Sequence, residues 1–102
     1  MEKYTLYIGL NDKITKLQKV STFEAQKVVM NIVENFTEGG TIFEAQGFYT
    51  HESGVRVREA TLRLELLFTD EKAVKNIVEA VKLSLNQESI AVQKEVIHSE
   101  LW

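Results

Sequence analysis

The sequence predicts an α+β fold whose four strands and two helices follow one another in the order βαββαβ. Alternation of apolar and charged residues over positions 58–68 indicates a strand with one buried face and one face in water. Apolar residues at steps of three and four, within 25–36 and 74–85, indicate two helices that are each buried on one side. Together these patterns predict two layers, an antiparallel sheet and two helices packed on one of its faces.

Composition narrows both the class of protein and its partners. A length of 102 residues predicts one domain over residues 1–102. Because a net charge of −3 provides no basic surface, we expect no nucleic-acid partner. The absence of cysteine excludes disulfides and thiolate chemistry. The start has no apolar leader and no apolar run could span a bilayer, so we expect a cytoplasmic protein without membrane contact.

The first expected strand covers residues 4–10 and ends at Asn11–Asp12, because both side chains favour turns. Its buried face consists of Tyr4, Leu6, Ile8 and Leu10. The long connection 11–20 then carries Lys13, Lys16 and Lys19. We favour a helical turn that packs Ile14 and Leu17 inward, and the alternative is an anion site beside the next helix N-terminus.

Ser21 and Glu24 form a capping-box pattern, in which each side chain accepts from the other's backbone N–H. The helix behind them buries Ala25, Val28, Val29, Ile32, Val33 and Phe36. Gly39–Gly40 is expected to end this helix in a left-handed conformation. The pair follows a helix and precedes a strand, which is the wrong order for a phosphate-binding loop.

Residues 41–49 predict a second strand, which the polar hairpin tip 51–54 joins to the third. The third strand places one set of residues on its apolar side, namely Arg58, Ala60, Leu62, Leu64, Leu66 and Phe68. Its polar side consists of Glu59, Thr61, Arg63 and Glu65.

Thr69, Asp70 and Glu71 supply a cap and negative charge for the second helix, and Asn86 is expected to end it. The buried stripe of that helix consists of Val74, Ile77, Val78, Val81 and Leu85. A last strand carries Ile90, Val92 and Val96 on one side, which Lys94 interrupts, as suits a sheet edge. Right-handed crossovers then favour strand order 4-1-3-2, the ferredoxin-like arrangement.

The polar sheet face is the first candidate site. It brings Thr5 and Tyr7 beside the polar side of the third strand, and Tyr49 or Gln46 joins them. Three interpretations stay open: a solvated face with cross-strand ion pairs, self-association with Tyr7 and Leu67 at the interface, or a site for a small polar ligand. The ligand or interface residues are predicted to be Tyr7, Tyr49, Arg58, Glu59 and Arg63.

Arg58 and Glu59 form a second candidate. Arg58 falls on the apolar side, so its guanidinium pairs with a helix glutamate or forms an anion clamp at the sheet end. We expect no catalytic residue, no cofactor and no metal. His51 and His98 lack ligands at metal-binding spacing, and no nucleophile motif is present.

Four segments of the chain resemble a family of small bacterial proteins of unknown function with a ferredoxin-like fold. The segments are 4–10, 40–49, 57–59 and 87–92, and the resemblance covers most of the chain. It implies the fold, a recurrent aromatic after Gly47 and the Arg58–Glu59 pair, and no activity. The expected function is a small binding or interaction module that self-associates as a dimer or higher oligomer through its open sheet face; the alternative is a small-molecule enzyme or ligand sensor.

Overall fold

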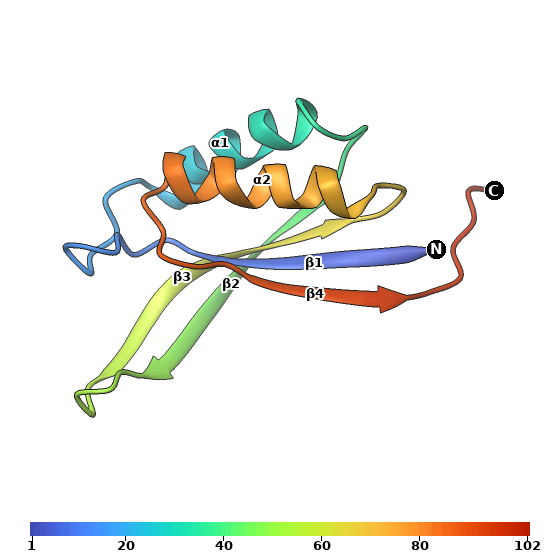
Figure 1. Cartoon of the computed structure of the whole chain (residues 1–102). Coiled ribbons are helices and arrows are strands. Elements are labelled where there is room, and N and C mark those ends of the chain that lie inside the picture. The colour runs from blue at the N-terminus through green and yellow to red at the C-terminus, as the bar shows by residue number, and fades with distance from the viewer.

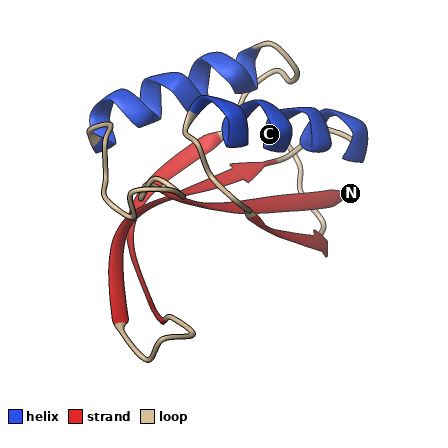
Figure 2. Cartoon of the chain, turned by 60° about the vertical axis from the view of Figure 1, so that its left-hand side comes forward, coloured by secondary structure: helices blue, strands red, loops and turns tan.

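A computed structural model describes all residues from Met1 to Trp102. The elements are β1 (Glu2–Gly9), α1 (Thr22–Glu34), β2 (Thr41–Thr50), β3 (Arg56–Leu66), α2 (Glu71–Ser84) and β4 (Ala91–Val96). All strand pairs are antiparallel, in the order β2-β3-β1-β4, and both helices cover the same face of the sheet (Figures 1 and 2). The predicted ferredoxin-like arrangement is confirmed.

The two central strands supply the middle of the core. Leu6 of β1 lies opposite Leu64 of β3, and Ile8 lies opposite Leu62, with all four side chains buried beneath the helices. The helices add the buried residues Ala25, Val29, Val33, Val74, Ile77 and Val81. The alternating pattern of β3 is therefore confirmed from Ala60 to Leu66, because only one face of the sheet is covered.

Capping residues fix the start of both helices. The side chain of Ser21 accepts from the backbone N–H of Glu24, and Asp70 accepts from the N–H of Ala73. The reciprocal half of the predicted capping box is not formed, because the Glu24 carboxylate faces Lys27 instead, at 3.6 Å. The prediction that Asn86 ends α2 is confirmed by its positive φ of 49° just beyond the helix.

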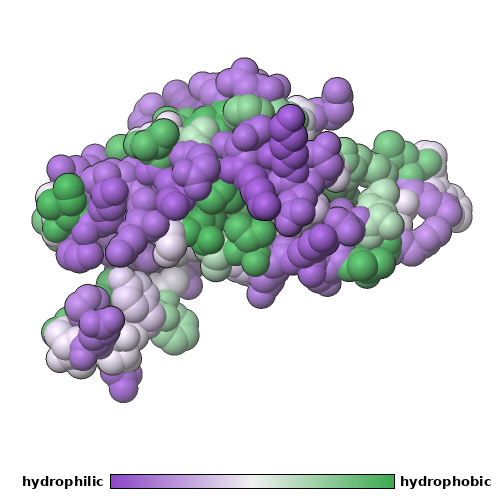
Figure 3. Space-filling view, in the orientation of Figure 1, coloured by the Kyte–Doolittle hydropathy of each residue, from purple (hydrophilic) through white to green (hydrophobic).

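Beyond the helices, β2 and β3 continue as a two-stranded ribbon. Pairing of β3 with β1 stops at Thr61, whereas its pairing with β2 runs on to Arg56. We call residues 46–60 the arm. It curves away from the helical layer at the end of the sheet opposite to the chain termini (Figures 1 and 2), and it projects clear of the body in the space-filling view (Figure 3). The helices therefore cover neither face of its outer part.

The structure overturns the favoured interpretation of the connection 11–20. Ile14 is 75% exposed and Leu17 is 69% exposed, so neither packs inward. The segment is a tight loop closed by an isolated bridge between Asn11 and Gln18 and by a hydrogen bond from the Asp12 N–H to the Leu17 carbonyl. The loop is held by Asp12 and not by its apolar residues.

Three other expectations are wrong at element ends. α1 ends at Glu34, which leaves Phe36 largely exposed, and neither Gly39 nor Gly40 has a positive φ. A Cβ at Gly40 would instead press on the side chain of Leu66, so close approach of β3 explains that glycine. Phe68 lies past the end of β3 with a φ of 55° and is exposed.

The last strand is an edge strand as predicted, but its valines are not buried. Val92 and Val96 are both exposed, although Val92 lies opposite the buried Leu6 of β1. Neither helix has the length and apolar character that would let it cross a membrane.

Candidate functional site

A cleft of about 610 Å³ lies where the inner side of the arm meets two loops. We call it the arm cleft. It is lined by residues of the loop 11–16, of the arm and its tip from Tyr49 to Glu59, and of the connection 87–89. These segments are distant in sequence. The chain just after β1 joins them, because the N–H groups of Leu10 and Asn11 donate to Ala60 and Glu59 of β3. Ten of the thirteen lining residues are polar or charged.

Glu59 is fixed at the bottom of this region by its neighbours. Its carboxylate accepts a hydrogen bond from the backbone N–H of Asn11 at 3.0 Å. It also occupies the space above Gly9, where a Cβ would overlap both carboxylate oxygens. Gly9 therefore leaves room for this carboxylate in its observed position, where Glu59 of the arm bonds to the first loop.

Asp12 shapes the loop beside Glu59. Its carboxylate accepts from the side-chain amide of Asn86 at 2.8 Å and from the backbone N–H groups of Ile14 and Thr15. The Asn86 bond first, and then the two backbone bonds, hold the pKa of Asp12 well below its ordinary value, although burial opposes this. The ionised carboxylate thus joins the first loop to the end of α2.

The connection after α2 is held against the same loop. The side-chain amide of Gln87, which is buried, donates to the carbonyl of Asn11 at 2.8 Å, and the N–H of Lys13 donates to the carbonyl of Asn86. Four hydrogen bonds from two remote segments therefore fix the outline of the cleft, and its charged groups stand on a preformed frame.

The charged groups at the mouth of the cleft have no partner within the chain. Lys13 and Lys16 form no ion pair, and neither does Glu88. The ring of Tyr49 is half exposed on the arm side, and the His51 ring bonds only within the tip, to Ser53. The cleft therefore presents the ammonium groups of the two lysines, the carboxylates of Glu59 and Glu88 and the ring of Tyr49 to one volume.

A second polar group lies at the centre of the open sheet face. Tyr7, Arg63 and Phe43 form one row across β1, β3 and β2, and the guanidinium of Arg63 lies 4.3 Å from the centre of the Phe43 ring. Glu65 faces both Arg63 at 3.7 Å and Lys3 at 3.1 Å. The Nε of Arg63 is buried and has no hydrogen-bond partner.

By strand register, four of the five predicted site residues lie on the helix-free face of the sheet, and only Arg58 lies on the other face. The four form two groups within that face. Tyr7 and Arg63 lie at its centre, and Tyr49 and Glu59 line the arm cleft. Arg58 points to the opposite side of the arm, across from Phe48, and forms no ion pair. The expected glutamate partner on a helix is wrong, because no helix covers the arm. The alternative, an anion clamp formed by Arg58 at the end of the sheet, stays a prediction.

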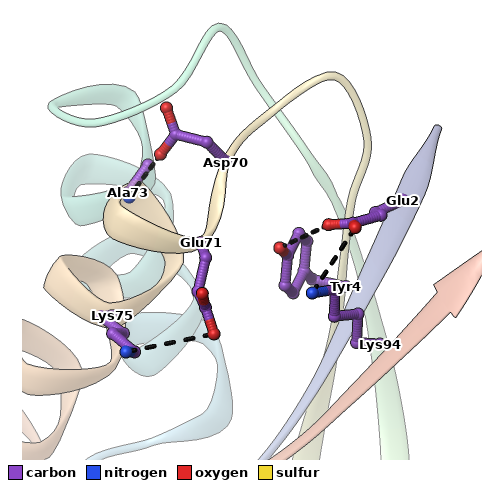
Figure 4. Close-up of polar contacts among 7 residues, drawn as sticks. All are labelled: Glu2, Tyr4, Asp70, Glu71, Ala73, Lys75 and Lys94. Carbon is purple, nitrogen blue, oxygen red and sulfur yellow. Dashed lines mark hydrogen bonds and ion pairs between the residues drawn. The ribbon is translucent and has the colours of Figure 1, made fainter.

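A third polar cluster closes the other end of the sheet (Figure 4). The hydroxyl of Tyr4 donates to Glu2 at 2.9 Å, and Lys94 faces the same carboxylate at 3.5 Å. Burial, followed by the Glu2 hydrogen bond, raises the pKa of Tyr4 to about 12, so the phenol stays neutral and structural. No three His, Asp or Glu side chains gather as a metal site would require. His51 lies in the tip of the arm, and His98 lies in the segment after β4.

Sequence reasoning missed Asp12 as the organiser of the cleft. It gave the residue a turn-forming role but could not supply the partner, Asn86, which lies 74 positions further along the chain. The three lysines of the loop were noted, and the apolar residues between them suggested a buried turn instead. Only the tertiary structure shows that Ile14 and Leu17 pack against no other element.

Comparison with known proteins gives a family and a fold. The family model of DUF3574, a protein of unknown function, matches residues 3–99. No curated protein matches the chain. Among solved structures, a phage SAM lyase in complex with S-methyl-5′-thioadenosine is similar at a TM-score of 0.65 and 18% identity, over 92% of this chain and 79% of that one.

Two further structures have the same arrangement. CutA from Synechococcus elongatus is similar at a TM-score of 0.61 and 12% identity, over 94% of this chain and 75% of that one. A DUF3240 family protein from Shewanella baltica gives a TM-score of 0.56 and 10% identity, over 99% and 94% of the two chains. At such identities the likeness extends to the fold alone.

Proposed function

The chain belongs to the DUF3574 family, whose function is unknown, and we propose that it is a binding module. Its ligand would be a small polar molecule held in the arm cleft. The observation that carries this proposal is the convergence of three remote segments on a preformed cleft whose lysines have no partner in the chain. Unpaired charges that surround a concave, hydrogen-bonded frame are typical of a ligand site.

The side chains favour a ligand that carries a phosphate or carboxylate group at one end. Lys13 and Lys16 would pair with that anion, since charged hydrogen bonds are the strong ones. Glu59 keeps an unused oxygen for a donor at the other end of the ligand, and Tyr49 offers a ring for a flat group. The phage lyase of similar fold is described with S-methyl-5′-thioadenosine, which supports the idea that this fold accommodates a small organic molecule.

Thermal unfolding with a panel of probes tests the proposal. The panel is inorganic phosphate, citrate, glutamate and adenosine 5′-monophosphate. A ligand at ten times its Kd adds about 1.4 kcal/mol to the folded state, which raises Tm by roughly 6–11 °C in a chain of this size. Calorimetric titration then gives the Kd of each probe that shifts Tm.

A matched pair of double variants locates the binding. Lys13→Ala with Lys16→Ala should weaken binding by roughly tenfold or more, because a charged hydrogen bond contributes about 1.5–3 kcal/mol. Lys72→Ala with Lys75→Ala removes the same charge from the exposed side of α2 and should leave the Kd unchanged. The proposal fails if no probe shifts Tm, or if both double variants bind equally well.

Self-association through the open sheet face is the second candidate. It is favoured by the aromatic side chains of Tyr7 and Phe43, which are both exposed on this face, and by the mixed charges of Lys3 and Glu65 beside them. Arg63→Glu should then reduce the mass measured by light scattering to that of one chain. An unchanged mass would exclude this interface. A cytoplasmic location is part of the same proposal, and cell fractionation would test it.

A further inference from the structure

The outer face of the arm is an exposed apolar and basic surface that no part of its own chain covers. Phe48 is 83% exposed and lies directly opposite Arg58, and Arg56 lies two pairs further out on the same face. With the neighbouring strand residues they line a hollow of about 800 Å³. Neither arginine has an ion pair, in a chain whose net charge is negative. A two-stranded ribbon is of marginal stability by itself, so this surface favours a partner.

The opposite end of the molecule carries a segment with the complementary chemistry. Residues 97–102 follow β4 without regular structure. Leu101 and Trp102 are almost completely exposed, and the carboxylate of Glu100 contacts only His98, at 2.9 Å. The segment is anchored at its start, where the N–H of Ile97 donates to the carbonyl of Met1.

This segment cannot reach the arm of its own chain. Val96 pairs with Glu2 at the first end of β1. At the other end of β1, Gly9 pairs with Thr61, and Arg58 lies three residues beyond Thr61 on β3. The end of β4 and Arg58 are therefore about 33 Å apart along the strands. Six residues span at most about 21 Å when fully extended. Any contact between them therefore joins two molecules.

We propose that residues 97–102 of one copy dock on the outer face of the arm of a second copy, so that copies associate head to tail. Trp102 and Leu101 pack on Phe48, and Glu100 pairs with Arg56 or Arg58. Trp and Arg are the residues that most often dominate binding at such contacts. Each copy offers one arm and one segment, so the contact is heterologous and forms a closed ring or an open chain. This inference does not depend on a ligand in the arm cleft.

Mixing of two variants tests the inference by light scattering coupled to size-exclusion chromatography. The segment variant carries Leu101→Ser and Trp102→Ser, and the arm variant carries Phe48→Ser and Arg58→Glu. All four positions are exposed, so both variants should keep the far-ultraviolet circular dichroism of the wild type. Each alone should have the mass of one chain, whereas the wild type is larger. Their mixture should stop at two chains, because one intact arm meets one intact segment.

A control separates this contact from other surfaces. Leu83→Ser removes an equally exposed leucine from α2 and should leave the wild-type mass unchanged. The inference is overturned if the wild type has the mass of one chain, if either variant keeps the wild-type mass, or if the mixed variants stay apart. Loss of association in Arg63→Glu alone would assign the contact to the open sheet face instead.

Discussion

Asp12 shows how a short polar side chain can organise a loop that its apolar neighbours do not hold. The side chains of Ile14 and Leu17 are exposed to solvent. The Asp12 carboxylate accepts three hydrogen bonds, from the side chain of Asn86 and from the backbone N–H groups of Ile14 and Thr15. Because all three donors favour the ionised form, the pKa of this carboxyl lies below its ordinary value of 3.8. The loop is therefore most stable when Asp12 is charged.

The acid stability of the protein should depend on Asp12. A lowered pKa in the folded state stabilises the fold fully above about pH 4, and this contribution is lost as the pH falls toward the folded-state pKa. Asp12→Asn should lower Tm at neutral pH and make Tm less sensitive to pH below about 4. Calorimetric melting across this range measures both effects, and parallel curves for the two proteins would rule out the role given to this residue.

A substitution at Gly9 tests the role of the Glu59 carboxylate in the arm cleft without changing the packing of the core. A Cβ at this position overlaps the Glu59 carboxylate, which is the far end of a flexible side chain and can move. Gly9→Ala should therefore weaken binding of a probe in the arm cleft and cost little stability. Gly39→Ala is the matched control, since a Cβ there meets no atom within 4 Å, and it should add about 0.4–1 kcal/mol to stability.

Titration of both variants with the same probe decides the outcome. Equal Kd values for the Gly9 and Gly39 variants would mean that the Glu59 carboxylate takes no part in binding.

At the scale of elements, β3 has two halves with different physical roles. From Thr61 to Glu65 it is paired on both sides, and the half that ends at Leu66 buries three leucines, whereas from Arg56 to Ala60 its ladder partners all belong to β2. A strand of eleven residues thus belongs partly to the core and partly to the arm. The sequence pattern of alternation runs through both halves, which is why it predicted the strand and could not predict where the helical cover ends.

Hydrogen exchange should separate these halves. Amides of the outer arm, between residues 46 and 59, should exchange through local opening in a dilute sample, whereas amides from Thr61 to Leu66 should exchange only near the free energy of global unfolding. At high concentration, docking of a second copy should slow exchange in the arm. Uniform protection along all of β3 at every concentration would contradict this division.

At the scale of the whole molecule, local patterns predicted the element order, the strand order and the covered face. Alternation in β1 and β3 and helical stripes in α1 and α2 report burial directly, so these features follow from the residues alone. The β4 valines, Phe68 and Arg58 were assigned to the covered side because alternation tells which residues share a face and not how far the helices extend.

The candidate site followed less closely from the sequence. Tyr49 and Glu59 were named, but their partners, among them Lys13, Gln87 and Asn11, belong to segments that only the tertiary structure brings together. Contacts between residues 48 and 76 positions apart leave no local pattern.

Amide chemical-shift mapping by NMR with inorganic phosphate as the probe tests the central claim most directly, because it locates binding on the intact chain. The arm cleft predicts saturable shifts at residues 11–16, at the inner arm from Tyr49 to Glu59 and at residues 87–89. Shifts confined to the Tyr7–Arg63 row, or no saturable shift anywhere, would contradict it.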